Sequence, residues 1–146
     1  MQYLPILYRL AVAFWVGGSV LFTFLLTPIL FKNYDRDQAG AIVGLLFPAY
    51  FRWGLACGAV ALASLLLMRG RQGLVQSVVI AVMLLITALH TFVIEPRAAA
   101  LKKEIPSFVT TPADHPLRRE FMKLHGISQA GNLAVIGGGI ALIIML

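Results

Sequence analysis

The chain has 146 residues, of which 60% are hydrophobic and 12% charged, with a net charge of +6 and a mean hydropathy of +0.87. Soluble domains carry about 25% charged residues, so this composition excludes an ordinary soluble fold and predicts one membrane domain over residues 1–146. Cys57 is the only cysteine, which excludes an internal disulfide and a Cys-rich metal site. Basic residues that anchor loops at the membrane explain the net charge, so we expect no nucleic acid partner.

The first apolar run, Leu10–Phe31, is long enough to cross a membrane. A spanning helix needs about 20 apolar residues for ~30 Å of hydrocarbon. We expect this helix to start near Pro5, because proline is tolerated in a first helical turn. The run is too long for the apolar part of a signal peptide, and no small-residue cleavage site follows it. We therefore predict a retained span.

The second run, Ala39–Met68, has 30 residues and is interrupted only by Arg52. This length exceeds what one span needs, and Pro48 divides the run. We therefore predict an interfacial or re-entrant segment up to about Phe47, followed by a span that ends near Met68. Arg69-Gly70-Arg71 then forms a tight connection, with glycine supplying the turn.

The third run, Leu74–Ile94, ends at Glu95-Pro96. Pro96 removes a backbone donor and crowds the carbonyl of Phe92, so the helix should kink or end there. Residues 97–104 are good helix formers and should extend the rod into the cytoplasm, and the prolines of residues 105–116 indicate a loop. With a fourth span, Gly126–Leu146, the predicted fold is an all-α, integral membrane four-helix bundle.

Orientation follows from the distribution of lysine and arginine, which concentrate in cytoplasmic loops. The first and third connections together hold Lys32, Arg36, Arg97, Lys102, Lys103, Arg118, Arg119 and Lys123. The opposite side holds Arg9, Arg69 and Arg71. We therefore predict a multi-pass membrane protein with both termini on the side opposite the cytoplasm, which is the periplasm for a protein of a bacterial inner membrane.

Polar residues form one stripe on the fourth expected span. His125, Ser128, Gln129 and Asn132 are spaced i, i+3, i+4 and i+7, which places them on one helical face. This face should point into the protein, because lipid offers polar groups no partners. Two interpretations stay open, a ligand site and hydrogen bonding between helices.

Depth estimates bring His90 to the level of this stripe. Gly126 and Glu95 mark the cytoplasmic ends of the fourth and third apolar runs. At 1.5 Å per residue, Asn132 lies ~9 Å deeper than Gly126, and His90 lies ~8 Å deeper than Glu95. We therefore predict that His90, His125, Gln129 and Asn132 converge around a small polar cavity in the cytoplasmic half. His90 and Glu95 are five residues apart and do not share a face.

Arg52 and Glu95 are the two charged residues expected near hydrocarbon. We predict that they form an ion pair, because an unpaired buried charge is strongly destabilising. A cation bound between the Glu95 carboxylate and the free Phe92 carbonyl is the alternative.

His90 and His125 are candidate ligands for a metal or haem, since neutral imidazole is a common ligand. Met83 could share a helix face with His90, and Met122 could share one with His125. A methionine and a histidine together would suit Cu(I). No haem-attachment, zinc-protease, di-iron, phosphate-loop or Ser-His-Asp motif occurs. Small-residue motifs at Gly54-xxx-Gly58 and Ala130-xxx-Ala134-xxx-Gly138 favour close helix packing inside the bundle over a homodimer interface.

Short motifs along the chain resemble a known family. They are Trp15-Val16-Gly17-Gly18, Thr27–Phe31, Ala39-Gly40, Gly44–Phe47 with Tyr50, Glu95-Pro96-Arg97, and Phe121–His125 with Ser128 and Asn132. Their order resembles the bacterial four-span domain-of-unknown-function family related to the eukaryotic cisplatin-resistance-associated transmembrane protein. That family more loosely resembles the copper-resistance protein D superfamily, which includes a haem-containing oxidase. The resemblance implies a fold and a membrane address, but no established reaction, and the first expected span lacks the oxidase histidine.

The favoured function is binding or transport of a small solute or metal species in the membrane. The candidate ligand-binding residues are Arg52, His90, Glu95, His125, Ser128, Gln129 and Asn132. A haem- or copper-dependent redox enzyme that uses His90 and His125 is one alternative, although no catalytic residue is assigned. An accessory or scaffold subunit of a membrane complex is the other. Transport by so short a chain would need a homo-oligomer or a larger complex.

Overall fold

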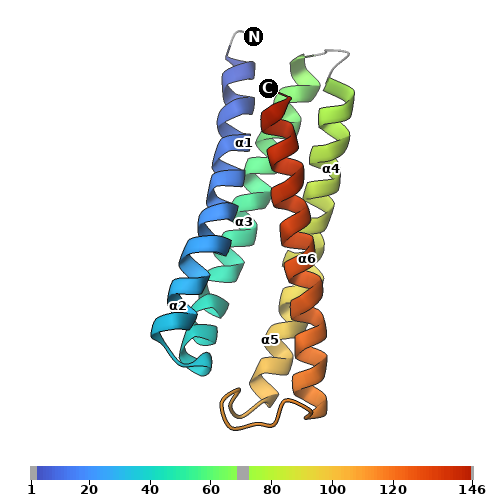
Figure 1. Cartoon of the computed structure of the whole chain (residues 1–146). Coiled ribbons are helices and arrows are strands. Elements are labelled where there is room, and N and C mark those ends of the chain that lie inside the picture. Colours follow the sequence, from blue (N-terminus) through green and yellow to red (C-terminus); the bar gives the residue numbers. More distant parts are fainter. Residues whose placement is uncertain (1–2, 69–72, 146) are drawn as a thin grey trace.

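The computed structural model describes residues 3–68 and 73–145. Figure 1 shows long helical rods that run alternately up and down, with both termini at one end of the bundle. Four rods are long and apolar enough to cross a membrane, and no strand occurs among the described residues. The predicted all-α four-helix membrane fold is therefore confirmed.

Two of the four rods are assembled from three helical segments each. The first rod comprises α1 (Leu4–Val20), the π-helical segment η1 (Leu21–Leu26) and α2 (Thr27–Asn33), and the second is α3 (Arg36–Met68). The third comprises α4 (Gly73–Leu89), the π-helical segment η2 (His90–Ile94) and α5 (Glu95–Glu104), and the fourth is α6 (Pro116–Ile144). We call the end with both termini the termini end, and the opposite end, which carries the loop 105–115, the loop end (Figure 1). The predicted turn at Arg69-Gly70-Arg71 lies outside the described residues.

An apolar core joins the rods in the half nearest the termini. Each rod contributes a side chain with 0% exposure: Val12, Ala61, Ile80 and Leu142. A Cβ atom on Gly58 would lie 2.5 Å from Leu84 Cδ2 and 2.6 Å from Trp15 Cζ3. The absence of a side chain at Gly58 therefore allows α3 to approach both neighbours, as internal packing of the Gly54-xxx-Gly58 motif predicts.

The predicted division at Pro48 is wrong, because α3 runs without a break from Arg36 to Met68. Pro48 removes only the donor that would reach the Gly44 carbonyl. Spanning helices tolerate such a proline when apolar turns on both sides stay packed against neighbours. Ala39, Val43, Phe51 and Gly54 are buried on the two sides of Pro48, so packing holds the helix together.

The prolines at positions 28 and 96 each follow a π-helical segment. The N–H of Thr27 donates to the Phe22 carbonyl, and the N–H of Glu95 donates to the His90 carbonyl, each five residues back. Each proline lacks the N–H that a regular helical hydrogen bond needs. A wider turn just before the proline replaces the regular bonds there with bonds to the carbonyl five residues back. The third rod therefore continues past Pro96 to Glu104, and residues 105–115 form the predicted loop.

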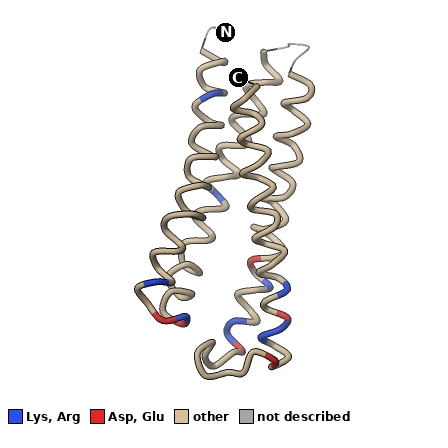
Figure 2. Tube along the Cα trace, in the orientation of Figure 1, with Lys and Arg blue, Asp and Glu red and all other residues tan. Residues whose placement is uncertain are grey.

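Charged residues gather at the loop end of the bundle. Figure 2 shows Lys, Arg, Asp and Glu crowded near the turn after α2 and around α5 and the start of α6, with few elsewhere. Long stretches of the rods are thus left apolar, as a membrane-embedded protein requires.

Candidate functional site

Asn132 of α6 joins three rods through its side-chain amide. The Tyr50 hydroxyl of α3 donates to Asn132 Oδ1 at 2.5 Å, and Asn132 Nδ2 donates to Thr23 Oγ1 of η1 at 2.7 Å. The amide therefore uses both its acceptor and its donor inside the bundle. Because hydrocarbon offers no competing partners, this chain of bonds fixes how the three rods approach one another.

His90 completes the polar region from the third rod, and only 3% of the residue is exposed. Its Nδ1 lies 2.6 Å from the Ile86 carbonyl oxygen, and its Nε2 lies 3.0 Å from the Ser128 carbonyl oxygen. A neutral imidazole donates through one nitrogen, so one of the two contacts is a hydrogen bond in the neutral ring. Both nitrogens are directed at the backbone. A Cβ on Gly131 would lie 2.4 Å from His90 Cε1, so this glycine makes room for the ring.

These side chains surround a small cavity of about 10 Å³. This volume is near the minimum that holds one water molecule. Its lining combines aromatic walls, among them Trp15 and Phe51, with polar groups from all four rods: Ser19, Tyr50, Thr87, His90 and Asn132. We call Thr23 and these five polar residues the central polar cluster.

The two π-helical segments position part of this cluster. Thr23 lies in η1 and His90 begins η2, so each of the two proline-associated segments presents one polar side chain to the interior. The Tyr50 ring stacks on Phe22 of η1, with ring centroids 4.4 Å apart. π-helical turns are often found at functional sites, because they rotate a side chain out of the regular helical register.

The structure brings together only some of the candidate residues. His90 and Asn132 line the cavity, and Ser128 contributes its backbone carbonyl. Gln129 is exposed, and half-buried His125 stacks on Phe121 without lining the cavity. The predicted convergence is therefore wrong for His125 and Gln129, because the stripe on α6 is wider than the strip of that helix facing the interior.

Sequence reasoning did not assign Ser19, Thr23, Tyr50 and Thr87 to the site. Ser19 and Thr23 are four residues apart, and Thr87 lies three residues before His90, so each pair shares one helical face. Only the packing of different rods shows that these two faces and Tyr50 converge. Thr87 also donates to the Met83 carbonyl at 2.8 Å, a local bond that serine and threonine often make in helices.

The expected Arg52–Glu95 ion pair does not form among the described residues. Arg52 is exposed on the outside of α3, whereas Glu95 is half-buried and lies close enough to Lys102 for Coulombic attraction. Gly54 packs beside Thr87, so these two residues lie at the same depth. Arg52 is two residues closer to the loop end than Gly54, and Glu95 is eight residues closer than Thr87. At 1.5 Å per residue, Glu95 therefore lies ~9 Å nearer the loop end than Arg52. The two charges therefore differ in both depth and direction. Insertion scales put the cost of an unpaired arginine at mid-membrane at ~2.5–3.5 kcal/mol.

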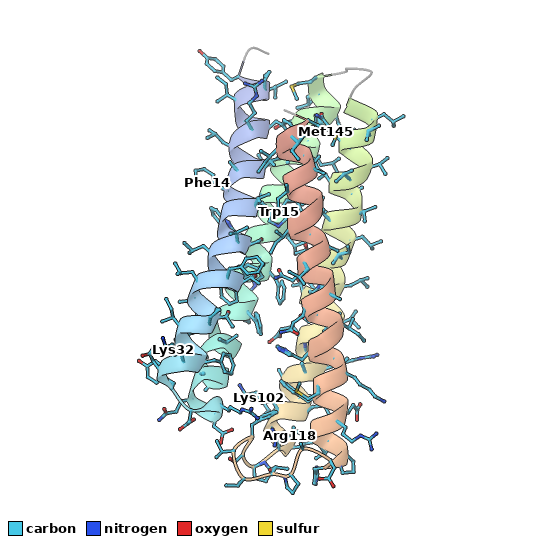
Figure 3. The ribbon with its side chains drawn as sticks, in the orientation of Figure 1. Phe14, Trp15, Lys32, Lys102, Arg118 and Met145 are labelled. Atoms are coloured by element: carbon cyan, nitrogen blue, oxygen red, sulfur yellow. The ribbon has the colours of Figure 1, made fainter. Side chains whose placement is uncertain are left out.

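A set of polar contacts, which we call the loop-end latch, ties α3 to the far side of the bundle. The Asp37 carboxylate accepts hydrogen bonds from the Ser107 hydroxyl and, at 2.6 Å, from the Phe108 N–H. Lys102 reaches from α5 to donate to the Gly40 carbonyl at the start of α3 (Figure 3). The latch therefore adds polar contacts to the local apolar packing at the loop end, where Ala39 and Ile105 are buried and Phe108 contacts Phe121.

His90 and His125, the two predicted metal or haem ligands, lie in different surroundings, His90 against backbone carbonyls and His125 against Phe121. Among the described residues, no three His, Cys, Asp or Glu side chains gather where they could hold a metal ion. Both nitrogens of His90 already face carbonyl oxygens. Without a change of conformation, His90 offers no lone pair to a copper or haem iron.

The fold and the site define a four-helix membrane protein with a polar cluster buried between its spans. Residues 10–107, more than half of the chain, match the family described as "Domain of unknown function (DUF4149)", and the chain belongs to that family. A protein of Aquifex aeolicus (strain VF5), described as "Uncharacterized protein", is 34% identical over 124 residues, which cover 85% of this chain and 82% of the relative. No solved structure matches the chain. The wider resemblance to the cisplatin-resistance-associated protein and to the copper-resistance protein D superfamily stays a prediction.

Proposed function

We propose that this protein binds a small, uncharged, hydrogen-bonding solute within the membrane at the central polar cluster. The observation that carries the proposal is the cavity beside Asn132, into which four rods direct polar groups. A packed apolar interior would be the simpler way to hold four spans together. Polar groups retained at this depth instead mark where a membrane protein handles water or a solute.

The chemistry of the cavity selects the class of solute. Its polar lining consists of hydroxyls, one amide and an imidazole whose nitrogens face the backbone, and no carboxylate, lysine or arginine lines it. Such groups exchange hydrogen bonds with a neutral solute, whereas an ion would need a counter-charge. The aromatic walls would cover the apolar part of the solute. An uncharged solute therefore fits better than a metal species.

The cavity must enlarge before it can hold more than a water molecule. The loop end is the natural site for this movement, because polar contacts such as Lys102 to Gly40 and Asp37 to Ser107 hold it. The opposite half is fixed by a continuous apolar core. We therefore place the entry path at the loop end (Figure 1).

Intrinsic fluorescence gives a direct binding test. The chain has two tryptophans, Trp15 and Trp53, and both line the cavity. Titration of the purified protein in detergent with urea, glycerol or ethanol, kept below denaturing concentrations, should give a saturable change in emission for at least one solute. Asn132→Leu should abolish the change, because it removes the amide from the cavity.

The matched control is Tyr8→Phe, which removes a hydroxyl from the termini half and should leave the solute response unchanged. If all three probes leave the wild-type emission unchanged while Asn132→Leu only lowers stability, the cluster serves to hold helices together. Proteoliposomes that pass the binding solute faster than empty vesicles would extend binding to transport.

The membrane orientation is part of this proposal. We place the loop end in the cytoplasm of a bacterial cell, because the two connections there carry most of the lysine and arginine residues. Reporter fusions at Arg71 and Ile105 test the orientation. Cytoplasmic activity at Arg71 together with none at Ile105 would reverse it, and the entry path with it.

A further inference from the structure

Arg52 is an exposed charge at the centre of a spanning helix. It lies sixteen residues from each end of α3, or ~24 Å at 1.5 Å per residue. The neighbouring Trp53 Nε1 is 3.4 Å from the Phe14 carbonyl oxygen, which fixes this level well inside the first rod. A hydrocarbon layer of ~30 Å centred on α3 would leave Arg52 ~15 Å from either surface, farther than the side chain extends. In the described part of the chain, Arg52 has no hydrogen bond or ion pair that would balance its charge.

One stripe of α3 carries alanines on both sides of Arg52. The exposed positions of this stripe, spaced alternately four and three residues apart, are Leu45, Ala49, Arg52, Ala56, Ala59, Ala63 and Leu66. Exposed Trp53, Val60 and Leu67 lie beside the stripe. We call the residues of the stripe the α3 outer face. Spacing of this kind follows the stripe along which two helices wind around each other with a left-handed crossing. Small side chains on such a stripe let two backbones approach closely within a membrane.

The exposed face of α4 provides the contrast. Its large exposed side chains are Leu74, Val75, Val78, Val82, Leu85 and Leu89. Bulky aliphatic residues of this kind are suited to contact with lipid chains. The same chain therefore presents bulky aliphatic side chains on α4 and, on α3, a stripe in which alanines flank an uncompensated charge.

The charge decides which occupant fits the α3 outer face. A second copy joined symmetrically through this face would bring two Arg52 side chains together, and like charges repel. The chain's carboxylates lie only within residues 35–37 and 95–120, so none is level with Arg52. Lipid phosphates lie at the membrane surfaces, out of reach of a side chain at mid-depth. An anionic group at the right depth can come from a carboxylate on another protein's spanning helix.

We infer that the α3 outer face docks a transmembrane helix of a different protein, and that Arg52 pairs with an aspartate or glutamate near the middle of that helix. Alanines on both sides of Arg52 allow the close approach that a short ion pair requires. The pairing removes the cost of an unbalanced charge in hydrocarbon. This assignment does not depend on the solute site, because Arg52 does not line the cavity.

A designed spanning helix tests the inference. The full chain, labelled at its C-terminus with a donor dye, is reconstituted into phosphatidylcholine vesicles with acceptor-labelled Leu/Ala peptides whose central residue is Asp, Asn or Leu. Energy transfer should show about tenfold tighter association with the Asp peptide than with the Leu peptide. Arg52→Leu should remove this preference, and Arg52→Glu should transfer it to a peptide with a central Lys.

Two further variants separate the contact surface from the charge. Ala56→Leu keeps Arg52 but blocks close approach, so it should weaken association with the Asp peptide. Ala81→Leu makes the same change at an exposed position of α4 and should leave association unchanged. Because all three altered positions are exposed, helical content by circular dichroism should match the wild type throughout.

Three outcomes would overturn the inference. The first is equal association with the Asp and Leu peptides. The second is self-association of the labelled chain that falls with Arg52→Leu and with Glu95→Gln, which would assign the face to a second copy. The third is a response of the wild type, but not of Arg52→Leu, to phosphatidylglycerol without any choice among peptides, which would assign Arg52 to lipid.

Discussion

The two halves of the bundle are held together by different chemistry. In the termini half, apolar side chains from all four rods form one core around Val12, Ile80 and Leu142. Towards the loop end, the rods are joined by specific polar contacts, first around Asn132 and then through Asp37 and Lys102. Non-directional apolar packing resists separation, whereas hydrogen bonds can exchange one partner for another.

Two tyrosines show the difference most clearly. Tyr8 in α1 is 3% exposed, and its hydroxyl is the one buried side-chain polar atom without a hydrogen-bond partner among the described residues. The Tyr50 hydroxyl lies in the polar cluster and donates to Asn132. The same hydroxyl group is thus left unpaired in the apolar half and used in the polar half. The contrast indicates that the termini half is the stable platform and that the loop half carries the adjustable site.

Gly58→Val should have the largest effect on stability, because it disturbs the platform itself. Its side chain would overlap Leu84 and Trp15, which the Gly58 Cβ position approaches to 2.5 and 2.6 Å. Overpacking of this kind costs about 3 kcal/mol. A thermal or denaturant unfolding series in detergent measures the loss.

Gly17→Ala is the matched control for this change. Nothing lies within 4 Å of a Cβ at Gly17, so the alanine should be tolerated and should stabilise α1 by about 0.5–1 kcal/mol. A similar loss of stability in both variants would show that glycine flexibility, rather than close packing, matters in this half.

Asn132→Leu should have the next largest effect, because it breaks the centre of the polar half. The change leaves the Tyr50 hydroxyl without its acceptor and Thr23 without its donor. Unpaired buried polar groups cost about 1–3 kcal/mol. A double-mutant cycle with Tyr50→Phe should show strong non-additivity, since both changes remove the same bond. Additive losses would mean that the two side chains do not act as one unit.

The fold could be predicted from the sequence because its signal is collective. Four long apolar runs predict four spans, and changing any one residue of a run would not alter this prediction. The loop after Glu104 follows from closely spaced prolines. Pro48 was the exception. A local breaker rule predicted a division there, and packing on both sides of the proline overrode it.

The site was only partly predictable because it depends on which rods face each other. Asn132 and His90 were found from depth along single helices, and the structure places both at the cavity. Tyr50 belongs to no polar stripe, and Thr23 shares a face only with Ser19 and Thr27 of its own helix. Both become part of the cluster through contacts over 82 and 109 residues of chain. Arg52 was misplaced for the same reason: charge alone predicted a partner within the chain, whereas helix rotation turns the residue outward.

The two tyrosines also give a smaller, sharper test of the comparison. Tyr50→Phe should destabilise the protein by about 1 kcal/mol, because it removes one buried hydrogen bond. Tyr8→Phe should cause no loss, because its hydroxyl has no partner to lose. Matched unfolding curves measure both. Equal losses would show that the Tyr8 hydroxyl is satisfied in solution and that the halves differ less than their contacts indicate.

The smallest expected effect is local and concerns the loop-end latch. Asp37→Ala removes the acceptor of the Phe108 N–H and of the Ser107 hydroxyl, which tie residues 105–115 to α3. We expect unchanged global unfolding but faster hydrogen exchange at the Phe108 amide, because local opening no longer breaks those bonds. The exchange rate of Phe108 in Asp37→Asn should fall between those of the wild type and Asp37→Ala, since the amide oxygen still accepts a hydrogen bond but carries no charge. Asp114→Ala, an exposed position in the same loop, serves as the control and should leave exchange at Phe108 unchanged. If Asp37→Ala also leaves Phe108 exchange unchanged, the latch does not hold the loop, and the entry path at this end would need another closing element.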